Sequence, residues 1–221
     1  MKTTIYLVRH CEATGNVQRI CHGITDSDIT DNGRSQLECL TKRFEDVALD
    51  CVYSSHLFRA QETARAIIRN KEIPHHVDER LSEIHVGEWE NIPWKDLPAL
   101  YPEQSENWSY HPEKFAAPKG ESMVQMYSRM KDALNTIIKS HEGKTIAVVS
   151  HGCAVRNALC WAHGWDVSQL SDVSWGDNTS VSKIEVDEEG VHLVFENDCS
   201  HLSEDLSTIN KQNWWKTGEF E

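Results

Sequence analysis

Three short apolar runs in this chain are each followed at once by polar residues. The runs are continuous rather than alternating, which is typical of strands that are covered on both faces. We therefore expect three buried strands whose carboxyl ends carry polar side chains. The runs and the residues after them are 4–8 with Arg9 and His10, 50–53 with Ser54 and Ser55, and 145–149 with Ser150, His151 and Gly152.

Helical patterns separate these runs. Apolar residues recur three and four positions apart in four segments, at about 37–47, 57–67, 123–137 and 152–162. Strands that alternate with helices of this length indicate β-α-β crossovers. The pattern predicts an α/β fold, a three-layer α/β/α sandwich with a mainly parallel central sheet. Ligands in such sheets bind at the carboxyl ends of the strands.

Two further segments depart from this alternation. Residues 91–120 contain five of the six prolines together with several aromatic residues, and we expect them to form a small cap or lid insertion over the site. Residues 181–186 and 191–195 alternate around a polar turn, which predicts a β-hairpin. The tail after His201 is polar and includes Trp214-Trp215, for which no pattern indicates a role.

Size and charge narrow the classes of function. A chain of 221 residues with this composition is expected to form one domain over 1–221, with 91–120 as its insertion. Its formal charge of −13 opposes binding to nucleic acid or to anionic membranes. No apolar run approaches the roughly 20 residues of a membrane span, and no signal segment precedes the first strand, so we expect a cytoplasmic protein. A homodimer is a possible assembly, which the sequence does not decide.

The cysteines and histidines do not indicate a metal. Seven cysteines without a C-x-x-C pair are expected to be reduced thiols, and a structural zinc is not expected. Twelve histidines include no H-E-x-x-H motif. We therefore expect no metal and no cofactor.

Arg9 and His10 are the first candidates for chemistry. A neutral imidazole is a nucleophile towards phosphorus, and an adjacent arginine can bind phosphoryl oxygens. An isolated Arg-His pair far more often lies on the protein surface without a catalytic role. Its position at the end of a buried strand favours a functional role. His151 and Gly152 stand at a second strand end where a helix begins, which is a natural anion site. The alternative interpretation is that His151 is a structural histidine in a strand-to-helix turn, and that Gly152 is present only for the backbone geometry of that turn.

Arg59 begins the helix after the second strand. From there its side chain could reach the same crevice, although a lone helical arginine is more often solvated.

Five blocks, taken in order, resemble the histidine phosphatase (phosphoglycerate mutase-like) superfamily. They are residues 7–16 (LVRHCEATGN), 54–64 (SSHLFRAQETA), 81–90 (LSEIHVGEWE), 120–122 (GES) and 148–152 (VVSHG). The short insertion after the third block is similar to that of the broad-specificity and α-ribazole-phosphate phosphatases. The resemblance implies that His10 is phosphorylated, that Glu83 is the general acid and base, and that the phosphate is bound by Arg9, Arg59, His151, Gly152 and Asn16.

The chemistry of the reaction agrees with these roles. A leaving alkoxide needs a proton, and the water that later attacks phosphohistidine must lose one, so one carboxyl can serve both steps. Burial would raise the pKa of Glu83 in the required direction, while the arginines oppose that shift. Without its block, Glu83 would be interpreted as a surface carboxylate. Two arginines and two histidines can bind the three equatorial oxygens, so no Mg²⁺ is required.

The resemblance leaves two reactions open. A metal-independent phosphatase transfers the phosphoryl group of a small phosphomonoester to water, and a 2,3-bisphosphoglycerate-dependent mutase transfers it to a second phosphorylated acid. Residues 91–120 contain no arginine and only Lys95, Lys114 and Lys119, which favours the phosphatase and a less anionic or partly apolar leaving group. An alternative of another class is a non-catalytic module that binds phosphorylated ligands or proteins.

Three cysteines are expected on loops near the crevice. Cys11 stands where the family usually has glycine, and Cys21 and Cys153 lie in two of the other loops. One hypothesis is that their oxidation inhibits the enzyme. The interpretation that we favour is that they are small buried residues.

Overall fold

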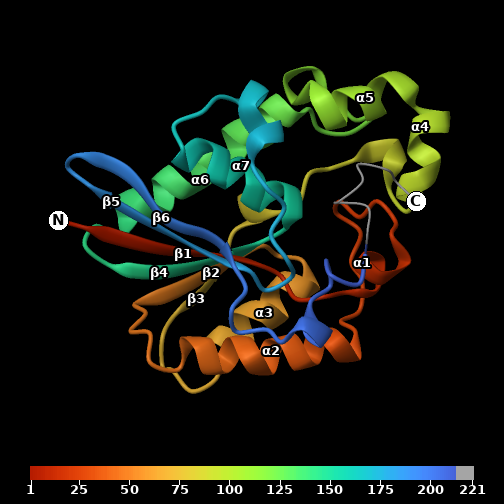
Figure 1. Cartoon of the computed structure of the whole chain (residues 1–221). Coiled ribbons are helices and arrows are strands. Elements are labelled where there is room, and N and C mark those ends of the chain that lie inside the picture. The colour runs from red at the N-terminus through yellow and green to blue at the C-terminus, as the bar shows by residue number, and fades with distance from the viewer. Residues whose placement is uncertain (213–221) are drawn as a thin grey trace.

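A computed structural model describes residues 1–212 of the chain, so Trp214-Trp215 lies outside the described residues. Its strands form a six-stranded sheet in the order β3-β2-β4-β1-β5-β6 (Figure 1). Strands β3, β2, β4 and β1 run parallel, while β5 is antiparallel to both β1 and β6. The strands are β1 Thr3–Arg9, β2 Cys51–Ser54, β3 His75–Val77, β4 Thr145–Ser150, β5 Val181–Asp187 and β6 Gly190–Asp198.

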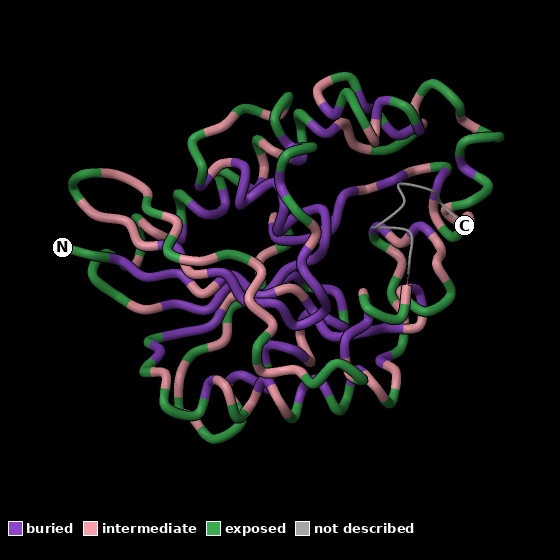
Figure 2. The backbone as a smooth tube through the Cα atoms, in the orientation of Figure 1, coloured by how far each residue is buried: buried purple, intermediate pink, exposed green. Residues whose placement is uncertain are grey.

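Helices cover both faces of the sheet, as Figure 1 shows. Successive residues of a strand point to opposite faces, so an apolar run supplies two cores at once. Ile5 and Leu7 of β1 pack with α6 and α7, whereas Val8 packs with α2 and α3 on the other face. Figure 2 shows the buried strands between these helical layers. The helices are α1 Thr14–Gln18, α2 Asp31–Phe44, α3 Phe58–Ile68, α4 Leu97–Leu100, α5 Pro102–Tyr110, α6 Met123–Ser140 and α7 Gly152–Ala162.

The predicted α/β sandwich with a mainly parallel sheet is therefore confirmed. Two predicted helical positions lie just outside their helices. Val47 follows the end of α2, and Leu57 is the residue that precedes the first turn of α3. The predicted hairpin is also present as β5 and β6, and Gly190 begins β6 with a φ of 133°, which favours glycine. None of the described helices is long and apolar enough to cross a membrane.

Residues 91–120 form short helices around an aromatic cluster. Trp89 has ring neighbours in this segment, at 6.5 Å from Trp94, 6.0 Å from Trp108 and 5.1 Å from Phe115 between ring centroids. Pro102 occupies the first position of α5, where its missing N–H costs no hydrogen bond. The segment is thus ordered by aromatic packing that is continuous with the main apolar core through Leu97 and Phe115. Its short helices besides α4 and α5 are the 3-10 turns Trp94–Asp96 and Pro112–Lys114.

Candidate active site

The carboxyl ends of β1 and β4 bring two histidines together. The strands are parallel neighbours, and Arg9 at the end of β1 lies opposite Ser150 at the end of β4. His10 and His151 follow directly, and their ring centroids are 5.1 Å apart. Both side chains are buried. Two residues that are 141 positions apart in the sequence therefore share one crevice because parallel strands end at the same edge.

The imidazole of His10 is held in one tautomer. Its Nδ1 lies 2.6 Å from the carbonyl oxygen of Cys11, which can only accept a hydrogen bond. Nδ1 therefore carries the proton, and Nε2 keeps its lone pair. Burial, followed by the charges of Arg59 and Arg9, lowers the pKa of His10 well below its ordinary value of 6.5. At neutral pH the ring is thus uncharged, with the Nε2 lone pair available.

His151 is the residue that precedes the first turn of α7. Neither ring nitrogen has a hydrogen-bond partner among the described residues, although the side chain is fully buried. Burial, followed by the charges of Arg59 and His10, lowers its pKa well below 6.5. Buried polar groups without partners are rare in proteins and call for an explanation. A ligand oxygen placed between the two histidines would provide one.

Buried Arg59 and partly buried Arg9 face these rings. Arg59 is 2% exposed and donates from Nη2 to the Gly23 carbonyl and from Nη1 to the Thr25 carbonyl, each at 2.9 Å. Arg9 donates from Nη1 to the carbonyl oxygen of Gly176 at 2.5 Å, and its buried Nε has no partner in residues 1–212. Both guanidiniums are therefore fixed in place by backbone oxygens. Such planar donors suit the oxygens of a phosphoryl group.

Glu83 lies in the same pocket, on the loop between the 3-10 turns Glu79–Leu81 and Gly87–Trp89. Its carboxylate accepts hydrogen bonds from the amides of Ile84 at 3.0 Å, Cys153 at 3.0 Å and Ala154 at 3.1 Å. Burial raises the pKa of Glu83 above its ordinary value of 4.5, although these amides and the two arginines act in the opposite direction. The carboxyl group can therefore hold a proton at a higher pH than an exposed glutamate.

The start of α7 differs from the expectation in one respect. The sequence predicts that its amides point at a bound anion, whereas two of them, from Cys153 and Ala154, hold the Glu83 carboxylate. The Gly152 amide is left for another anion. A side chain at Gly152 would approach Trp175 Cζ3 at 3.1 Å and the Arg9 guanidinium carbon at 3.4 Å. Gly152 thus allows Arg9 and Trp175 to pack closely against the helix.

Asn16 lines the pocket from α1. Its Oδ1 accepts a hydrogen bond from the Ala13 amide at 3.0 Å, and the Asn178 side chain donates to the same oxygen at 3.5 Å. The amide nitrogen of Asn16 is then the donor that remains for a ligand. All seven residues that the sequence singles out, Arg9, His10, Asn16, Arg59, Glu83, His151 and Gly152, are thus brought to one crevice, and six of them line the cavity there directly.

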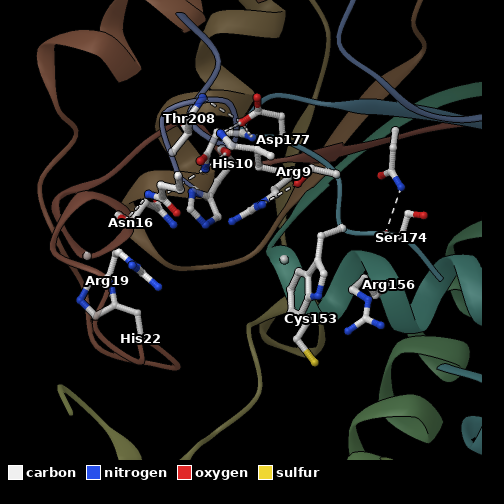
Figure 3. Close-up of a pocket in the computed structure, with 18 of the residues that line it drawn as sticks. Arg9, His10, Asn16, Arg19, His22, Cys153, Arg156, Ser174, Asp177 and Thr208 are labelled. Atoms are coloured by element: carbon white, nitrogen blue, oxygen red, sulfur yellow. Dashed lines mark hydrogen bonds between the residues drawn. The ribbon is translucent and has the colours of Figure 1, made fainter. Parts of the chain in front are cut away.

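This crevice opens into a cavity of about 750 Å³. Figure 3 shows Arg9 and His10 at its centre, with Asn16, Arg19 and His22 on one side and Cys153 and Arg156 on the other. Residues 91–120 contribute Trp94, Trp108, Ser109 and Tyr110 to the wall, and none of their lysines lines it. The cavity is therefore cationic around His10 and largely aromatic on the side of that segment.

Sequence reasoning missed the polar turn before β5. Asn178 donates from its side chain to the His10 carbonyl at 2.9 Å, and the Thr179 amide donates to the same oxygen at 3.2 Å. The β-branched Thr179 has a φ of 60°, a strained conformation that is often found at functional sites. The sequence feature that could have indicated this turn is the polar stretch Gly176-Asp177-Asn178 ahead of β5. Because β5 runs antiparallel to β1, the start of β5 lies beside the end of β1.

Two more segments were missed. Ser207, Thr208 and Ile209 hydrogen-bond to the buried carboxylate of Asp177 and line the cavity, although the tail gave no periodic pattern. Arg156 of α7 donates to the carbonyls of Val173 and Leu170 and stacks on Trp175 at 4.3 Å. Burial lowers the pKa of Arg156 to about 10, so it stays charged at neutral pH.

The three cysteines near the crevice are buried. Cys11, Cys21 and Cys153 are at most 2% exposed. Burial raises the pKa of Cys11 to about 12 and raises those of Cys21 and Cys153 well above their ordinary value of 9.0. A protonated, buried thiol reacts slowly with oxidants. This supports the interpretation as small buried residues over the redox hypothesis. Within residues 1–212, no group of three or more His, Cys, Asp or Glu side chains is arranged to hold a metal ion.

Comparison with known proteins connects this arrangement to one family. Residues 5–199 match the model of the histidine phosphatase superfamily (branch 1). The chain is 32% identical to phosphoserine phosphatase 1 of Hydrogenobacter thermophilus over 90% of its own length and 94% of that protein. It is 31% identical to the metal-independent phosphoserine phosphatase of Arabidopsis thaliana, over 91% of this chain and 84% of that one.

A solved structure is similar over almost the whole chain. The structure of Bacillus stearothermophilus YhfR aligns with a TM-score of 0.87 and 34% identity, and the alignment covers 91% of this chain and all of that one.

Proposed function

Because this chain belongs to the histidine phosphatase superfamily, we propose that it is a metal-independent phosphatase in which His10 carries the phosphoryl group as a covalent intermediate. It is a phosphomonoester hydrolase, as its phosphatase relatives are. The observation that carries the proposal is the state of His10. Its Nδ1 proton is held by the Cys11 carbonyl, and its neutral Nε2 lies among Arg9, Arg59 and a second histidine.

In the first step, Nε2 of His10 attacks the phosphorus atom of the ester. A nitrogen–phosphorus bond forms while the bond between phosphorus and the alcohol oxygen breaks. Arg9, Arg59 and His151, with Asn16 and the Gly152 amide, hold the equatorial oxygens, whose charge is spread over three atoms in the transition state. The protonated carboxyl of Glu83 gives its proton to the leaving oxygen, so that an alcohol leaves rather than an alkoxide.

In the second step, water attacks the phosphohistidine. The Glu83 carboxylate takes the proton of this water as its oxygen bonds to phosphorus and the nitrogen–phosphorus bond breaks. Phosphate leaves, His10 returns to its neutral form, and Glu83 is protonated again for the next turnover. The raised pKa of Glu83 supports this double role, since the group must be able to hold a proton in one step and lose it in the other.

Water rather than a second phosphorylated acid is the proposed acceptor. Residues 91–120 are the proposed cap, and their contribution to the cavity wall is aromatic, with no basic side chain. A mutase has to bind a second phosphate besides a carboxylate, and residues 91–120 supply no cation for that second phosphate. The substrate is accordingly a small phosphomonoester. O-phosphoserine is the first compound to test, because the two relatives described above are named phosphoserine phosphatases.

The experiment that tests the function is release of phosphate from p-nitrophenyl phosphate and O-phosphoserine in excess EDTA. A second reaction contains 3-phosphoglycerate and a trace of 2,3-bisphosphoglycerate, and its products are separated to detect transfer to carbon 2. Steady release in EDTA without transfer is the expected result. Transfer without net release would identify the mutase instead.

A binding module is the remaining alternative. It would be stabilised against thermal unfolding by phosphate, as any ligand stabilises the folded state that binds it, yet would release none from any ester. That pair of results would overturn the proposed function.

A further inference from the structure

Two guanidiniums that line the cavity, those of Arg19 and Arg156, have no role in the steps above, and that of Arg156 is already held by the carbonyls of Val173 and Leu170. Arg19 follows the last residue of α1 and lines the cavity on the side of Asn16 and His22 (Figure 3). Its side chain makes no hydrogen bond and no ion pair with any group in residues 1–212. This distinguishes Arg19 from Arg9 and Arg59, whose guanidiniums are held by backbone carbonyls.

The backbone of Arg19 is fixed in an unusual conformation. Its φ of 55° and ψ of 41° lie in the left-handed region, where glycine is at home and arginine is strained. Hydrogen bonds hold it from both sides, because its amide donates to the Gly15 carbonyl and its own carbonyl accepts from the Trp94 amide at 3.0 Å. Strain of this kind at a ligand cavity is a sign of function when the residue brings a useful side chain.

The surroundings leave this charge available to a ligand. Three carboxylates line the cavity: Glu83 is hydrogen-bonded by backbone amides, Asp177 by Ser207 and its neighbours, and the exposed Glu204 forms no ion pair within residues 1–212. Burial, followed by the charge of Arg59, lowers the pKa of the nearby His22. The Arg59 guanidinium is held by the carbonyls of Gly23 and Thr25, so on this side of the cavity Arg19 supplies the positive charge that has no partner in residues 1–212. A free guanidinium at the wall of a cavity recognises planar anions through paired hydrogen bonds.

We propose that Arg19 binds a carboxylate on the leaving group, so that the preferred substrates are phosphate esters of hydroxy acids. This inference rests on the proposed function. A dianionic phosphoryl group then faces the guanidiniums of Arg9 and Arg59, and a monoanionic carboxylate faces that of Arg19. The fourth guanidinium of the wall, that of Arg156, is held by two backbone carbonyls and the ring of Trp175. The aromatic wall from Trp94 and Trp108 then covers the uncharged part of the alcohol.

Two pairs of esters isolate the carboxylate. O-phosphoserine differs from O-phosphoethanolamine by that group alone, and 3-phosphoglycerate differs from glycerol 3-phosphate by a carboxylate in place of a hydroxymethyl group. The quantity measured is the ratio of kcat/KM within each pair, for the native protein and for Arg19→Gly, Arg19→Gln and Arg19→Lys. Arg34→Gln, at an exposed position of α2, is the matched control.

The native protein is expected to prefer the carboxylated member of each pair. In Arg19→Gly and Arg19→Gln the ratio should fall by about 10- to 100-fold, the range for losing one charge-assisted contact, mainly through KM. Arg19→Lys should retain part of the preference, and Arg34→Gln should retain all of it. Because glycine suits the left-handed conformation, Arg19→Gly should unfold at no lower a temperature than the native protein.

The proposal is overturned if the native ratio is near one, or if Arg19→Gly leaves the ratio unchanged while the protein stays folded. Its failure is distinguishable from failure of the proposed function. Hydrolysis of p-nitrophenyl phosphate without a preference for carboxylates would overturn the role of Arg19 alone. No hydrolysis of any ester by the native protein would overturn both.

Discussion

Glu83 and His151 are linked through the first turn of α7. The backbone amide of Cys153, two residues after His151, donates a hydrogen bond to the carboxylate of Glu83 at 3.0 Å. The Ala154 amide adds a second hydrogen bond from the same first turn of α7. The proposed acid and the proposed phosphate-binding histidine are thus positioned by one helix terminus. A rigid helix fixes their relative geometry more closely than two independent loops would.

Replacing Glu83 by glutamine should remove the transferable proton while keeping the amide contacts in part. We expect kcat for alkyl phosphates to fall by about 10²- to 10⁴-fold, the usual contribution of general acid–base catalysis. With p-nitrophenyl phosphate as the substrate, the rate of the first step should fall less, because p-nitrophenolate leaves without protonation. The matched control is Glu88→Gln, an exposed neighbour that pairs with Lys119. An unaltered rate on alkyl esters in Glu83→Gln would show that the acid is another group.

The pH profile of kcat/KM should have an acidic limb set by His10 and an alkaline limb set by Glu83. Activity requires neutral His10, so kcat/KM rises as pH increases through the pKa of His10, which burial and the arginines hold well below 6.5. It also requires protonated Glu83, so kcat/KM falls as pH increases through the pKa of Glu83, which burial raises above 4.5.

A profile on an alkyl phosphate, measured in the native protein and in Glu83→Gln, checks these assignments. The alkaline limb should disappear in the variant. If the alkaline limb lies at the same pH in both proteins, it belongs to a group other than Glu83.

Asn178 should be a positioning residue for the nucleophile. Its side chain donates to the His10 carbonyl at 2.9 Å and to Asn16 Oδ1 at 3.5 Å. Asn178→Ala should lower the free energy of unfolding by about 1–3 kcal/mol, because buried acceptors lose a donor, and should lower kcat by about tenfold. Kinetics with thermal unfolding measure both effects. Asn210→Ala, an exposed residue of the cavity rim, is the control, and native kcat in a folded Asn178→Ala protein would contradict the role.

The enzyme should resist oxidation and alkylation. Cys11, Cys21 and Cys153 are buried and their pKa values are raised, so little reactive thiolate exists at neutral pH. Peroxide or iodoacetamide at pH 7.5 should leave phosphatase activity intact, and peptide mapping should find alkylation first at the partly exposed Cys39. Inhibition that follows modification of Cys11, Cys21 or Cys153 would restore the redox hypothesis.

The sequence predicts the frame of the site because that frame depends on continuous apolar strands. Ile5, Leu7 and Val8 are buried on two faces, so their run is readable without knowledge of partners. The parallel order then places the residues after β1 and β4 at one edge, which is why His10 and His151 are found together.

The missed parts depend on pairings that leave no periodic pattern. Asn178 reaches His10 because β5 is antiparallel to β1, with Val181 opposite Val8. The segment around Thr208 is held by hydrogen bonds to residues far away in the sequence, Glu12, Gln36 and Asp177. Likewise, no sequence pattern indicates that Glu83 would take two of the amides of α7. The cap role of 91–120, a cytoplasmic location and a homodimer stay predictions.

The most direct test of the central claim is detection of phosphate on His10 during turnover. Native protein, His10→Ala and the exposed control His192→Ala are mixed with p-nitrophenyl phosphate in excess EDTA and quenched in alkali, in which phosphohistidine is stable. Peptide mass spectrometry should then find a phosphoryl group on the peptide that contains His10 in the native and His192→Ala proteins, and no turnover in His10→Ala. Turnover by His10→Ala, or a phosphoryl group on another residue in the native protein, would contradict the account.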